Sequence, residues 1–123
     1  MSEVKIIERG WAGHFIGALH CRFRRNTLVT DGKAYIVVSS VGLMETESGS
    51  GKFIQIGCGR YYETMAFHSM TEDTRYWDAD VSREVEFNSP WAIGEIDADD
   101  KMNEQHDTVV AEIKTRMEQG EWS

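Results

Sequence analysis

The sequence predicts an α+β fold, in which an antiparallel, barrel-like sheet of about six strands carries a C-terminal helix packed on it. Two observations support this prediction. Apolar and polar residues alternate with a period of two in several segments of residues 1–91, and apolar residues recur at helical spacing within residues 92–123. We expect the 123 residues to form a single domain, because a chain of this length holds one hydrophobic core and not two.

The sheet is predicted to be organised around residues 60–70. Both faces of this strand carry side chains large enough to need cover, which is typical of a central strand and not of an exposed edge. Because one helix covers only one face, we expect at least a homodimer with an apolar interface formed by strands. The two faces carry Tyr61, Glu63, Met65 and Phe67 on one side and Tyr62, Thr64, Ala66 and His68 on the other.

Three strands are predicted before this central one, at residues 4–11, 19–30 and 33–44. Asp31-Gly32 separates the second from the third and indicates a two-residue hairpin turn of type I′. That turn would place Phe23 opposite Ser40 in the ladder.

Arg25 interrupts the alternation of the second strand, because it falls on the apolar face. In the expected register it lies opposite Val38. Arg25 is then either an edge residue whose charge reaches out to water or a phosphate-binding residue in a cleft.

The strands that follow are predicted at residues 53–56, 75–80 and 81–88. Ser89-Pro90-Trp91 is expected to end the sheet, because proline cannot donate a hydrogen bond to a ladder.

A helix is predicted after this point. Asp97 or Asp99 can cap its beginning, and Gly120 ends it. Its apolar stripe consists of Met102, His106, Val109, Val110, Ile113 and Met117.

The formal net charge is −8, from 21 acidic and 13 basic side chains, which disfavours DNA or RNA as a partner. The local basic cluster at residues 22–25 suits a small phosphate ligand better than a long polyanion. No segment is apolar enough for a membrane span or a signal peptide. Cys21 and Cys58 form no CxxC pair, and we expect two buried, reduced thiols in a cytoplasmic protein.

No catalytic or metal-binding motif is found. Asp97, Asp99 and Asp100 resemble the start of a calcium loop, but the twelfth position is Thr108 where a bidentate glutamate is needed. His106 lies on the apolar stripe, where a core histidine with satisfied hydrogen bonds competes with a ligand or a base. We therefore expect a non-enzymatic protein with no metal and no cofactor.

Aromatic rings and arginines together favour a nucleotide-like ligand, since rings stack on bases and guanidinium groups bind phosphates in a bidentate manner. The alternative is that the rings belong to the core and the arginines are solvated. The candidate ligand-binding residues are Arg25, Arg60, Tyr61, Phe87, Trp91, Asn103, His106 and Arg116.

A series of phrases, covering residues 6–113, resembles the phage-encoded anti-Thoeris sponges, the first-described family of Thoeris anti-defence proteins. In chain order the phrases are ERGWAGHFIGA, FRRNTLV, VVSSVG, GRYYETMAFH, YWDADVS, FNSPWAI and DADDKMNEQHDTVVAEI.

This resemblance implies a small barrel-like sheet with a C-terminal helical part, assembled as dimers or higher multiples such as a hexamer. It also implies a function: sequestration, without hydrolysis, of the cyclic ADP-ribose isomers that bacterial TIR-domain proteins make as immune signals. Some members are implied to hold cyclic oligonucleotides at separate sites. Arg60, inside the GRYYE phrase, is the one site residue that the resemblance itself supports.

Two rival hypotheses remain open at this level. The acidic composition suits a small inhibitor that mimics DNA and binds a defence or nucleic-acid-processing protein, although the acids are interspersed with bases and form no dense runs. A structural subunit with no ligand is the third hypothesis.

Overall fold

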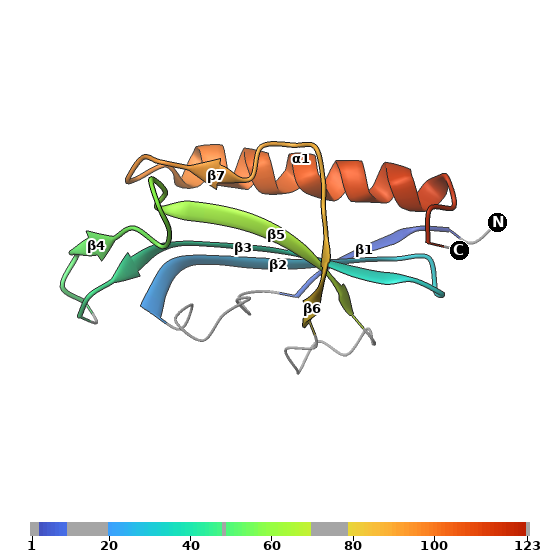
Figure 1. The fold of residues 1–123 in the computed structure, drawn as a ribbon, viewed down its shortest axis with the longest axis horizontal. Helices are drawn as coiled ribbons and strands as arrows, with labels where there is room; N and C mark the ends of the chain where they lie inside the picture. Colours follow the sequence, from blue (N-terminus) through green and yellow to red (C-terminus); the bar gives the residue numbers. More distant parts are fainter. Residues whose placement is uncertain (1–2, 10–19, 48, 70–78, 123) are drawn as a thin grey trace.

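The computed structural model of the chain describes residues 3–9, 20–47, 49–69 and 79–122. These residues form one antiparallel sheet of seven strands with a single helix lying along one face (Figure 1). The predicted α+β class and the helix packed on the sheet are thus confirmed. The sheet is open and does not close into a barrel, so the barrel-like part of the prediction is corrected.

The strands follow the order β1-β2-β3-β5-β6, with β4 paired to β3 and β7 paired to β5. β5 is therefore internal, as predicted for the strand at residues 60–70. The elements are β1 (Lys5–Glu8), β2 (Cys21–Thr30), β3 (Tyr35–Glu45), β4 (Phe53–Ile54), β5 (Tyr62–Ser69), β6 (Ala79–Val85), β7 (Ala92–Ile93) and α1 (Asp99–Glu118).

The β2–β3 register differs from the predicted one. Thr30 is paired with Tyr35, so four residues and not two connect the strands. The carboxylate of Asp31 accepts hydrogen bonds from the backbone nitrogens of Lys33 and Ala34, both at 2.9 Å, which stabilises the longer loop. The prediction of a two-residue type I′ turn at Asp31-Gly32 is thus wrong.

The register shift places Phe23 opposite Gly42 and Arg25 opposite Ser40. Because the shift is an even number of residues, each side chain keeps its predicted face.

The main core lies between the sheet and α1. Val29, Ile36 and Val38 of the central strands pack against Val109 and Ile113 of the helix, and all are fully buried. The apolar stripe predicted for the helix is confirmed, since its six residues are its buried ones.

The opposite face of the sheet is buried as well. Leu28, Val37 and Val41 have no exposed surface, and Phe67 is almost fully buried. Among the described residues, the central strands thus have buried side chains on both faces within one chain, so the reason given for the predicted homodimer does not hold for these positions.

The beginning of α1 has no side-chain cap among the described residues, so the predicted aspartate cap is wrong, but a tyrosine hydroxyl contacts its N-cap residue. Ala98 occupies the N-cap position, and Asp97 has a positive φ of 57°. The hydroxyl of Tyr62 accepts a hydrogen bond from the Ala98 nitrogen at 2.9 Å and donates one to Asp99 Oδ1 at 2.7 Å. The predicted stop is confirmed, because α1 ends at Glu118 and Gly120 follows with a φ of 80°.

The prediction that Ser89-Pro90-Trp91 ends the sheet is wrong. β7 returns to β5, where Ala92 pairs with Glu63. The predicted boundary between strands at residues 80 and 81 is also wrong, because β6 runs through it, and residues 75–78 lie outside the described residues.

Two further findings concern the sequence-based expectations. Cys21 is buried as expected, but Cys58 is exposed in the short turn between Gly57 and Gly59. Within the described ranges, no helix is both long enough and apolar enough to cross a membrane.

Candidate ligand-binding site

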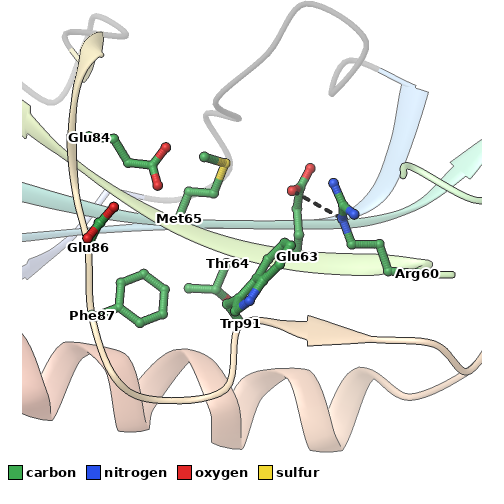
Figure 2. A pocket seen from close by; sticks show the side chains of 8 residues that line it. All are labelled: Arg60, Glu63, Thr64, Met65, Glu84, Glu86, Phe87 and Trp91. Atoms are coloured by element: carbon green, nitrogen blue, oxygen red, sulfur yellow. Dashed lines mark ion pairs between the residues drawn. The ribbon is translucent and has the colours of Figure 1, made fainter. Parts of the chain in front are cut away.

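A cavity of about 380 Å³ lies beside β5, on the side where β6 and β7 pair with it. Figure 2 shows its side chains around β5, with Phe87 between β5 and α1 in this view. Its lining consists of Arg60, Glu63, Thr64, Met65, Glu84, Glu86, Phe87 and Trp91.

The cavity exists because the ladder beside β5 is interrupted. The pairing of β6 with β5 ends at Val85–Ala66, and the pairing of β5 is taken up by β7 at Ala92–Glu63. Residues 86–91, which we call the arch, leave the sheet between these two points. The backbone nitrogen of Thr64 donates a hydrogen bond to the carbonyl oxygen of Trp91 at 2.7 Å, which fixes the far end of the arch to β5.

The guanidinium of Arg60 is held by its surroundings on three sides. Its Cζ lies 4.8 Å from the centre of the Trp91 ring, and its Nε lies 3.5 Å from Glu63 Oε2. A Cβ at Gly57 would overlap the guanidinium, so the glycine is what allows arginine and backbone to lie in contact. Among the described residues, the buried Nε has no hydrogen-bond acceptor at suitable geometry.

Two aromatic rings form the apolar walls. Trp91 is 46% exposed, which is high for a side chain of this size and leaves surface available for stacking. Figure 2 shows the Trp91 ring between Arg60 and Phe87. Phe87 is half-buried and packs against the main core, which holds its ring in place.

The lining contains three carboxylates, on Glu63, Glu84 and Glu86, and one guanidinium, on Arg60. The formal charge of the lining is therefore negative. Sequence reasoning missed all three as site residues. Strand alternation carried a signal for two of them, because Glu84 and Glu86 flank Val85, which packs in the core on the other face. In the part of the chain that the structure describes, no three metal-ligating side chains are grouped closely enough to hold an ion.

The helix α1 fixes the arch from below. Glu112 accepts hydrogen bonds from the backbone nitrogens of Asn88 and Ser89, at 2.9 Å each, and from the Ser89 hydroxyl at 2.6 Å. Burial alone would raise the pKa of Glu112, but these bonds and the charge of Arg116 hold it below its ordinary value. Arg116 in turn donates to the carbonyl oxygen of Glu86 at 2.8 Å.

The predicted site residues therefore divide into groups. Arg60, Phe87 and Trp91 line one cavity. Arg116 does not line it, but donates a hydrogen bond to the backbone of Glu86, which does. Tyr61 does not line the cavity; it is half-buried and packs against the core cluster around Tyr62.

Arg25 and Asn103 lie together elsewhere, between β2 and α1. Arg25 forms ion pairs with Asp107 at 2.7 Å and Glu8 at 3.2 Å and donates a long hydrogen bond to Asn103 Oδ1 at 3.4 Å. The charge of Arg25 is thus compensated within the chain. This geometry favours neither the edge residue whose charge reaches out to water nor the phosphate-binding residue in a cleft.

His106 is fully buried beneath the sheet and shares hydrogen bonds with Thr27 Oγ1 at 2.7 Å and Ser40 Oγ at 2.6 Å. Burial, reinforced by the charge of Arg25, lowers the pKa of His106 to about 3, against a raising effect of Asp107. Both ring nitrogens are occupied, so His106 is a core histidine and not part of the cavity.

Comparison of the chain with known protein families, curated proteins and solved structures finds no significant match. The function is therefore argued from the fold, the cavity and the chemistry of its lining.

Proposed function

We propose that the protein is a phage anti-defence sponge, which binds a cyclic nucleotide immune signal and sequesters it without degrading it. The ligand in this proposal is a glycocyclic ADP-ribose made by TIR proteins, taken up in the host cytoplasm before it activates the host effector. The observation that carries the proposal is that Arg60, Phe87 and Trp91, chosen as binding residues from the sequence, line one cavity.

The lining supplies the groups that a nucleotide needs. A cavity of about 380 Å³ falls at the lower end of the range for small-molecule sites, roughly 300–1,000 Å³. Trp91 and Phe87 offer stacking surfaces for a base, and Arg60 offers a planar guanidinium for phosphate oxygens. The guanidinium is positioned in advance by Trp91, which reduces the conformational entropy lost on binding.

Sequestration requires that the ligand survive binding. Among the described residues, those that line the cavity include no cysteine, histidine or serine, but they do include three glutamates and Thr64, which some hydrolytic sites use as bases or nucleophiles. The proposal assigns the protein no catalytic residue and no cofactor, and recovery of intact ligand is what tests this. It extends to a homo-oligomer and, as a second ligand class, to cyclic oligonucleotides, which the sequence resemblance implies for some members of the family.

A capture experiment tests the proposal. The purified protein is incubated with a TIR product mixture, washed and heat-denatured, and the released small molecules are identified by mass spectrometry. Intact cyclic ADP-ribose isomers are the expected result. Degraded nucleotide would show an enzyme instead, and the absence of any released compound would favour the acidic inhibitor that acts on a protein partner.

A further inference from the structure

The cavity has chemically different ends. Figure 2 shows Arg60 at one end and Glu84 and Glu86 at the other, with Trp91 between them. The register supports this separation, because Glu84 pairs with Phe67 near the end of β5, whereas Arg60 precedes the first residue of that strand. A ligand that spans the cavity therefore meets a hydrogen-bond donor at one end and acceptors at the other.

The carboxylates of Glu84 and Glu86 are available to a ligand. Both side chains are exposed, and neither carboxylate has an ion pair or hydrogen bond within the described residues. Glu63 differs, because it lies beside Arg60 and is largely buried. The two free carboxylates repel phosphate oxygens and accept hydrogen bonds from amines.

We infer that the cavity binds the aminopurine base of a nucleotide in one orientation. The exocyclic amine of the base lies at Glu84 and Glu86, and the phosphates of the nucleotide point toward Arg60. The inference rests on the proposed function and adds the part of the ligand that determines specificity. The base lies between Phe87 and the face of Trp91 that does not contact Arg60. A carboxylate accepts but does not donate, so a base with a carbonyl oxygen in place of the amine meets two acceptors.

The test compares glycocyclic ADP-ribose with its hypoxanthine analogue, made by deaminating the adenine. Binding of both compounds is measured by calorimetric titration. The parent protein is expected to bind the adenine form at least about tenfold more tightly, corresponding to one charge-assisted hydrogen bond. In a double Glu84→Gln, Glu86→Gln variant this preference should largely disappear, because an amide both donates and accepts.

A matched control carries the same change in net charge outside the cavity. Glu95 and Glu118 are exposed glutamates that pair with Lys101 and Lys114, and neither lines the cavity. The double Glu95→Gln, Glu118→Gln variant should keep the preference of the parent. Thermal melts of both double variants check that the fold is intact, as expected for exposed side chains.

The outcomes separate the inference from the proposed function. Equal binding of the two compounds by the parent, or a preference that survives in the Glu84→Gln, Glu86→Gln variant, would overturn the inference and leave the sponge intact. Binding of neither compound by the folded parent would overturn the proposed function and the inference with it.

Discussion

At the scale of single residues, the cavity depends most on Arg60, since its guanidinium contacts both Trp91 and Glu63. Arg60→Ala should weaken binding of cyclic ADP-ribose isomers by about 1.5–3 kcal/mol, roughly tenfold to over a hundredfold, because a charge-assisted contact is lost. Arg60→Lys should restore only part of the affinity, since an ammonium cannot form the bidentate contact. Calorimetric titration measures both effects, and thermal melts verify folding.

Gly57→Ala provides a matched variant that displaces the guanidinium without removing it. The added methyl group would overlap the Arg60 guanidinium, so that side chain must move away from its position against the Trp91 ring. Binding should weaken as it does in Arg60→Ala. If both variants are folded and bind like the parent, the ligand does not contact Arg60 and the cavity is not its site.

His106 predicts how stability depends on pH. Its folded-state pKa is about 3, whereas an ordinary histidine in the unfolded chain titrates near 6.5. Between these values the unfolded state takes up a proton that the folded state does not. The free energy of unfolding should therefore fall as the pH drops below about 6.5, by up to about 1.4 kcal/mol per pH unit.

Urea unfolding at several pH values between 7.5 and 5 measures this dependence. A His106→Gln variant removes the titrating group and keeps a polar side chain between Thr27 and Ser40. Its stability should be lower at pH 7.5 but should change less with pH. An identical pH dependence in parent and variant would show that His106 is not responsible.

At the scale of elements, the arch between β6 and β7 is positioned by α1 through Glu112. Glu112→Ala removes the acceptor for two backbone nitrogens and the Ser89 hydroxyl. We expect a loss of roughly 1–3 kcal/mol in the free energy of unfolding, and weaker ligand binding because Phe87 and Trp91 are less well positioned.

Glu118→Ala is the control for this prediction, since Glu118 is an exposed residue of the same helix and, within the described ranges, forms an ion pair with Lys114. It should change neither stability nor affinity by more than about 0.5 kcal/mol. Denaturant unfolding and calorimetric titration on both variants give the comparison. Equal behaviour of the two variants would mean that Glu112 does not position the arch.

At the scale of the whole molecule, the homodimer stays a prediction, although its original reason is gone. Both faces of the central strands are buried within one chain. What remains is the family resemblance, which implies dimers or higher multiples. The exposed apolar side chains lie on or beside different elements, and such scattered residues do not by themselves indicate an interface. They are Ile6, Ile54, Trp91 and Ile96.

Light scattering at micromolar concentration measures the assembly. We expect a mass of at least twice the 14.0 kDa of one chain. A mass of one chain would contradict the prediction and would require the ligand to be bound by a single cavity per molecule.

The sequence by itself determined the features that arise from local periodicity. The alternation in residues 60–70 identified β5 and its two faces, and the helical spacing identified the buried side of α1. Arg60, Phe87 and Trp91 were predicted as binding residues because guanidinium groups and aromatic rings suit a nucleotide in any fold, and Arg60 also because the family resemblance supports it. Apart from that resemblance, each of these inferences depends on residues close together in the chain or on side-chain chemistry alone.

Only the tertiary structure decided which of these residues meet. The interrupted ladder brings Glu84 and Glu86 to the same cavity as Arg60, and no pattern along the chain encodes that gap. The same packing removes His106 from the site, because α1 places its ring against two hydroxyls of the sheet. Register and helix docking are set by contacts between distant segments, whose energies depend on how whole surfaces fit together and not on the order of residues within one element.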